Sequence, residues 1–184
     1  MNKVILGLDV STSRIGICIL DYDKNLLRSE FIKMNSKDCL EDRCLVLENY
    51  ISNIDAYNSI NNKGYHISEV FVESPFMMFS GGKTTAMTMA KLQRFNGMVC
   101  YMIRRSLGIN PLCIAANKAR GLVGLKIKRG ENTKKKVIEW VEKEYPKEFV
   151  VEYTRHGNPK PGTDDMADSI VIARAGLLID EGER

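Results

Sequence analysis

Two apolar runs near the N-terminus, separated by a short polar turn, constrain the fold more than any other feature of this sequence. Residues 4–9 read VILGLD and residues 15–20 read IGICIL. The segment between them, residues 10–14 (VSTSR), is short, and its small polar residues favour a turn. The pattern predicts a buried β-hairpin whose first strand ends in an acid, Asp9.

The rest of the chain mixes strand-like and helix-like segments. Further strands are predicted at residues 26–34, 69–73 and 111–115, and helices at about 40–54, 84–107, 133–145 and 163–179. We expect Ser36 to cap the first of these helices, and Asn132 or Thr133 to cap the third. The order predicts an α/β fold with a mixed five-stranded sheet flanked by helices, in one domain over residues 1–184.

Composition excludes several classes of protein and site. With 44% hydrophobic residues, a chain of 184 residues can bury a sizeable core. No apolar run could span a bilayer, and the first one reaches Asp9 too early for a signal-peptide core. We therefore expect a cytoplasmic protein, in the host cytoplasm if the gene is viral. The five cysteines are expected as core residues, and Cys39 and Cys44 lack the second Cys or His pair of a zinc site.

The candidate catalytic residues are acids. Asp9 and Glu73 each end an apolar strand, where burying an unpaired carboxylate is costly. On the last helix Asp168 shares a face with both Asp165 and Asp164, so spacing alone does not choose between these two. Carboxylate oxygens suit Mg²⁺ or Mn²⁺, and two such ions about 4 Å apart can activate water and stabilise the leaving oxygen in phosphodiester hydrolysis.

Structural explanations compete with this one. Asp9 could accept hydrogen bonds from the turn at residues 11–13. Asp164 and Asp165 could be an acidic first turn that the helix dipole favours, although this explains Asp168, on a small apolar face, less well.

The acidic segments, taken in order, resemble those of RuvC-type Holliday-junction resolvases, which have a ribonuclease H-like fold. Residues 5–16 resemble the family's opening strand, acid, turn and second strand; residues 72–76 (VESPF) its second acidic strand; residues 165–170 (DMADSI) its closing helix. The resemblance implies two metal ions held by Asp9, Glu73, Asp165 and Asp168, and it favours Asp165 over Asp164. Asp164 and His156, which precedes the last helix, are candidate accessory residues, although His156 is better explained as an ordinary loop residue.

Basic residues crowd the region 118–136, where Glu131 is the one acid. They form either a solvated surface or one that contacts phosphates. The resemblance favours phosphate contacts, with Arg120 and then Lys118 near the scissile phosphate, and Lys134 and Lys135 at a later helix start. It also implies that Phe76 stacks at the branch point, although a core position would explain this side chain as well.

The resemblance implies a homodimer, joined through the helix at 84–107, that nicks two strands of a four-way DNA junction symmetrically. Residues 77–82 (MMFSGG) depart from the family's polar loop, which leaves any sequence preference at the junction open. Alternatives are a related nuclease acting on other branched DNA, on RNA or on an RNA–DNA hybrid, and a non-catalytic DNA-binding module. Residues 7–13 also resemble the first phosphate loop of sugar kinases and actin-like ATPases, but the chain is too short for their two domains.

Overall fold

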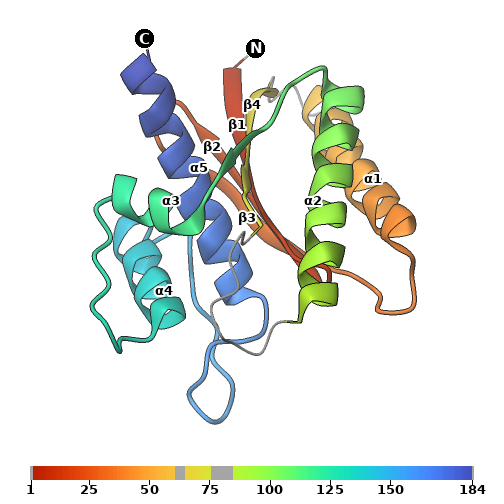
Figure 1. The fold of residues 1–184 in the computed structure, drawn as a ribbon. Coiled ribbons are helices and arrows are strands. Elements are labelled where there is room, and N and C mark those ends of the chain that lie inside the picture. Colours follow the sequence, from red (N-terminus) through yellow and green to blue (C-terminus); the bar gives the residue numbers. More distant parts are fainter. Residues whose placement is uncertain (1, 61–64, 76–84, 184) are drawn as a thin grey trace.

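The computed structural model describes residues 2–60, 65–75 and 85–183 (Figure 1). Its strands are β1 Asn2–Val10, β2 Arg14–Asp21, β3 Leu26–Lys33, β4 Tyr65–Glu73 and β5 Leu112–Ile114. Its helices are α1 Leu40–Ile60, α2 Ala86–Leu107, α3 Ala116–Leu122, α4 Thr133–Glu144 and α5 Thr163–Glu183.

The five strands form one mixed sheet in the order β3-β2-β1-β4-β5. The central strand β1 is antiparallel to β2 and parallel to β4. Asp9 lies opposite Gly16, and Leu8 lies beside Val72, so the next residues along the two parallel strands are Asp9 and Glu73. The sheet therefore brings two acids to the same end of adjacent strands.

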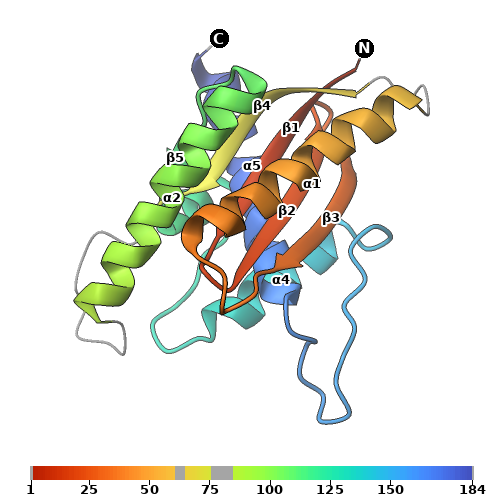
Figure 2. The same cartoon turned by 90° about the vertical axis from the view of Figure 1, so that its right-hand side faces the viewer.

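Helices cover both faces of the sheet, as Figures 1 and 2 show. Helices α1 and α2 lie on one face and bury alternate residues of the central strands, such as Leu6 and Leu8. Helices α3, α4 and α5 lie on the other face, where residues such as Ile5 and Ile170 form a second apolar cluster. The alternation of side chains along β1 thus supplies both layers of the core.

Helix α5 approaches the sheet very closely because glycines line its path. A Cβ atom at Gly7 would lie 2.5 Å from the Ser169 carbonyl oxygen, and one at Gly16 would lie 1.9 Å from the Asp165 carbonyl oxygen. Real Cβ contacts are never this short, so any side chain at these positions would push the helix away.

The predicted α/β class and mixed five-stranded sheet are confirmed. Asn132 caps α4 by accepting from the Lys135 backbone N–H. The Ser36 cap was wrong: a turn closed by the Asp38 N–H to the Asn35 carbonyl intervenes, and Cys39 precedes α1 instead. The seven-residue helix α3 was not predicted. Within the described ranges, no helix is both long and apolar enough to cross a membrane.

Candidate active site

The candidate site lies at the end of the sheet where β1 and β4 deliver their acids and α5 begins. Asp9 and Glu73 are partly buried at the strand ends, and Asp165 and Asp168 lie on the first turns of α5. Gly16 joins the two groups, because it pairs with Asp9 in the sheet and supports the Asp165 backbone directly. The helix acids are thereby held over the strand acids.

The pKa values of both strand acids are raised. Burial raises the pKa of Asp9 well above its usual value, and the carboxylates of Glu73, Asp168, Asp165 and Asp164 raise it further, in that order. Burial, together with the charge of Asp168, raises the pKa of Glu73 to about 7. Such mutual repulsion requires that the carboxylates share one small region.

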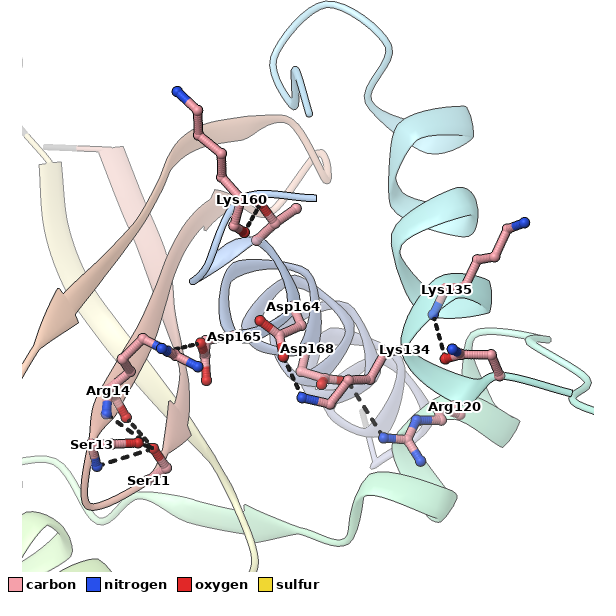
Figure 3. Close-up of polar contacts among 12 residues, drawn as sticks. Ser11, Ser13, Arg14, Arg120, Lys134, Lys135, Lys160, Asp164, Asp165 and Asp168 are labelled. Carbon is pink, nitrogen blue, oxygen red and sulfur yellow. Dashed lines mark hydrogen bonds and ion pairs between the residues drawn. The ribbon is translucent and has the colours of Figure 1, made fainter. Parts of the chain in front are cut away.

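Each helix acid, in contrast, has a basic partner (Figure 3). Arg14 Nε donates to Asp165 at 2.6 Å, and Arg120 Nη2 to Asp168 at 3.4 Å. The third partner is Lys134, whose ammonium group is paired with Asp164.

The helix acids differ in pKa as a result. Burial raises the pKa of Asp165 and of Asp168 although Arg14 and Arg120 oppose the shift. At Asp164 burial acts in the same direction, but the hydrogen bond and charge of Lys134 outweigh it and lower the pKa. Asp164 is therefore the most fully compensated of the three helix acids.

Hydrogen bonds within the turn after Asp9 fix the backbone of Arg14. Ser11 Oγ donates to the Arg14 carbonyl at 2.8 Å and accepts the Arg14 N–H at 3.0 Å. The buried Arg43 of α1 fixes the same turn by donating to the Thr12 carbonyl. The serines therefore close the turn, and in the described part of the chain no hydrogen bond runs from them to Asp9, so that structural explanation of Asp9 was wrong.

The donor chemistry of the site fits a hard divalent cation. Five carboxylates share the region, and burial, together with neighbouring carboxylates, raises the pKa values of Asp9 and Glu73, which a bound cation would oppose. Over the described ranges, no three His, Cys, Asp or Glu side chains converge closely enough to hold an ion together. Each α5 carboxylate is paired with a basic side chain: Asp165 with Arg14, Asp168 with Arg120 and Asp164 with Lys134.

The other predicted residues have varied positions. Lys118 on α3 and Lys135 on α4 are exposed, and Lys135 Nζ lies 3.9 Å from Glu139. His156 is exposed on the loop before α5 and accepts a hydrogen bond from Arg155 rather than from the site. Phe76 lies outside the described residues.

Two basic hollows border the acids, one on each side of the start of α4. One, of about 570 Å³, is lined by Arg120, Lys128 and Arg129. The other, of about 770 Å³, is lined by Arg14, Lys134, Lys135 and Lys160, together with the acids Glu139, Glu142 and Asp164. In the described part of the chain Arg120 Nε is buried without a hydrogen-bond partner, so this guanidinium retains a free donor.

Sequence reasoning missed Arg14, Arg43 and Lys160. Arg14 begins the second strand of the predicted hairpin, but its partner Asp165 lies 151 positions away, so no local pattern pointed to their contact. Arg43 and Lys160 gave no signal in the sequence, because neither lies next to one of the predicted acids.

Comparisons with known proteins give a fold. No family model and no curated protein matches the chain in sequence. Among solved structures, Thermus thermophilus RuvC in complex with a Holliday junction substrate has a TM-score of 0.66 and 14% identity, covering 98% of this chain and 96% of that one.

Two further structures agree. Another Thermus thermophilus RuvC structure has a TM-score of 0.61 and 17% identity over 97% of this chain and 96% of that one. The yeast mitochondrial Holliday junction resolvase Ydc2 has a TM-score of 0.55 and 15% identity over 95% of this chain and 77% of that one. The chain therefore has the ribonuclease H-like fold of RuvC resolvases over nearly its whole length.

Proposed function

We propose that this protein is a metal-dependent endonuclease that resolves four-way DNA junctions by symmetric phosphodiester hydrolysis. The observation that carries the proposal is the gathering of acids from β1, β4 and α5 at one end of the sheet, bordered by basic side chains. A binding module would gain nothing from such acids, since they repel phosphate. The RuvC fold adds a class of substrate, branched DNA.

Asp9, Glu73, Asp165 and Asp168 would hold the metal, as two Mg²⁺ or Mn²⁺ ions. When bound, the ions would supply the positive charge that favours an attacking hydroxide and stabilises the leaving oxygen. Asp165 is preferred to Asp164 because its backbone rests on Gly16, beside Asp9, whereas Asp164 is turned to Lys134.

The basic side chains would position the DNA. Arg120, which contacts Asp168 and lines the hollow with Lys128 and Arg129, would bind a phosphate oxygen next to the acids. Lys134, Lys135 and Lys118 would contact flanking phosphates, as would Arg14 once metal replaces it at Asp165. Phe76 is proposed to stack on a base at the branch point.

A homodimer would place two such sites on one junction. Helix α2 is the proposed contact surface, because it exposes Met87 and Tyr101, which are 80% and 69% accessible. Tyr101 also borders an apolar hollow between α1 and α2, with Leu45 and Met98. Paired nicks would then leave 5′-phosphates. The proposed location is the cytoplasm.

The decisive experiment is cleavage of a synthetic four-way DNA junction in Mg²⁺, beside a linear duplex, a flap and an RNA–DNA hybrid. Paired, symmetric nicks in the junction are expected, and Asp9→Asn should abolish them while retaining junction binding. Preferential cutting of the hybrid would show that the substrate is not a DNA junction, and it would leave the proposed metal site standing. Binding with no cleavage of any substrate would contradict the nuclease proposal.

A further inference from the structure

Two cysteines on the α2 face of the sheet form a close pair that the proposed active site does not use. Cys100 lies on α2 and Cys113 on β5, and their sulfur atoms are 3.8 Å apart. Both are free thiols, and Cys113 is exposed. A disulfide bond is about 2.05 Å long, so the sulfurs need only a modest further approach.

We propose that Cys100 and Cys113 are a redox-modification site at which hydrogen peroxide produces an intrachain disulfide joining α2 to β5. Cys113 is the residue that attacks, because it is exposed, and because a hydrogen bond from Cys100 lowers the pKa of its thiol to about 7. Cys100 is the resolving residue, since its sulfur is already in contact with that of Cys113.

The reaction balances with the peroxide as oxidant. The Cys113 thiolate attacks one peroxide oxygen, the O–O bond breaks, and Cys113 becomes a sulfenic acid while the other oxygen leaves as water. The Cys100 sulfur then attacks the Cys113 sulfur, the S–O bond breaks, and the Cys100 proton leaves with the hydroxide as a second water. The two thiols lose two electrons, and the peroxide gains them.

The pair also has a short physical connection to Glu73. The Cys100 sulfur lies 3.7 Å from Asn96 Oδ1, and the Asn96 amide donates to the Glu73 carbonyl at 2.9 Å. Asn96 is buried one helical turn before Cys100. To form a disulfide the Cys100 sulfur must move toward Cys113 and away from its contact with Asn96, so oxidation disturbs a residue that fixes the end of β4.

Cys39 provides a matched control. It is the other exposed cysteine, but its sulfur accepts the Asp42 N–H, and the Asp42 carboxylate raises the pKa of its thiol. It should therefore react with peroxide more slowly than Cys113.

The test is to treat the wild-type protein with one equivalent of hydrogen peroxide, alkylate it under denaturing conditions, and map disulfides by mass spectrometry. We expect a 100–113 linkage within one chain, in the wild type and in Cys39→Ser, that dithiothreitol reverses. Cys113→Ser should show none. A linkage between chains, oxidation mainly at Cys39, or no disulfide would overturn the proposal.

A second measurement, which rests on the proposed function, is junction cleavage by the same samples. Oxidised wild type should cut roughly tenfold more slowly, which is the lower end of the loss caused by changing a residue that supports a metal ligand. Peroxide-treated Cys113→Ser should keep its rate. An unchanged rate with complete disulfide formation would overturn the coupling to Glu73. No cleavage by the reduced protein would instead contradict the proposed function and leave the disulfide result standing.

Discussion

The acids on the strands and the acids on α5 belong to one site but have opposite surroundings. In the described part of the chain Asp9 and Glu73 make no ion pair, and their pKa values are raised by burial and by neighbouring carboxylates. Each α5 acid has a basic side chain within contact distance. Burial and neighbouring carboxylates therefore disfavour the ionised form of the strand acids, with Arg120 opposing the shift at Glu73, whereas each α5 acid is paired directly with a basic side chain.

This difference suggests a division of roles. Metal would bind most directly at the strand acids, where nothing must be displaced. On α5 it would exchange with Arg14 and Arg120, which become free to contact the phosphate backbone of the substrate. The same basic residues would thus compensate the site before metal and DNA bind, and contact DNA afterwards.

The largest expected effect comes from removing a strand acid. Asp9→Asn should lower junction cleavage on the order of 10³-fold, because losing several kcal/mol of metal-based stabilisation costs about one decade per 1.36 kcal/mol. Asp164→Asn, which removes the most compensated helix acid, should cost less than about tenfold by the same conversion. Single-turnover rates on one junction measure both. Equal losses in the two variants would contradict the division of roles.

The next largest effect is expected from a substitution that pushes the α5 acids away from the strand acids. In Gly16→Ala the added methyl group would meet the Asp165 backbone, so we expect the free energy of unfolding to fall by roughly 1–3 kcal/mol, as in overpacked cores. Gly182→Ala is the matched control on α5, since its Cβ meets nothing within 4 Å. Urea unfolding compares the two. A Gly16→Ala protein as stable as the control would show that the close approach is not required.

The pH dependence of stability is a third test. The pKa of Glu73 in the folded protein is about 7, above its ordinary value of 4.5. Between these values the unfolded chain loses a proton that the folded chain keeps, so without metal the free energy of unfolding should fall as pH rises from about 4.5 to 7. We expect a change on the order of 2 kcal/mol.

Glu73→Gln should remove much of this fall. Added Mg²⁺ should stabilise the wild type increasingly as pH approaches 8, because the metal binds the ionised carboxylate. Thermal unfolding across this range tests both points, and a wild-type stability that rises between pH 5 and 7 without metal would contradict the assignment.

The smallest expected effect concerns a single phosphate contact. Lys134→Ala should weaken junction binding and reduce the slope of log affinity against log salt by about one. Lys143→Ala, at the exposed far end of the same helix, should leave the slope unchanged. Titrations at several salt concentrations would decide, and equal slopes for the two variants would exclude Lys134 as a phosphate contact.

The sequence predicted the fold well because the strands and long helices have strong periodic patterns. The hairpin at residues 4–20 and the helix at 163–179 are examples, and both agree with the structure. Strand β4 begins at Tyr65 rather than near residue 69, because its first residues do not alternate between apolar and polar side chains. The short helix α3 has too few residues for a periodic signal.

The candidate site was less accessible to prediction than the fold. The acids could be named because Asp and Glu are unexpected at the ends of apolar strands. Their compensation by Arg14, Arg120 and Lys134 depends on contacts between residues 30 to 151 positions apart, which no local pattern encodes. The roles of all these residues, and the dimer, stay predictions.

The glycines beneath α5 have a consequence for how such chains can diverge. Positions 7 and 16 take no part in the proposed chemistry, yet each leaves no room for even a methyl group. In a library of single substitutions they would be among the least tolerant sites, beside acids that are intolerant for a chemical reason. A relative could therefore differ at most core and surface positions and still be identified by glycines at the positions equivalent to Gly7 and Gly16, whose role is to leave room for the backbone of α5.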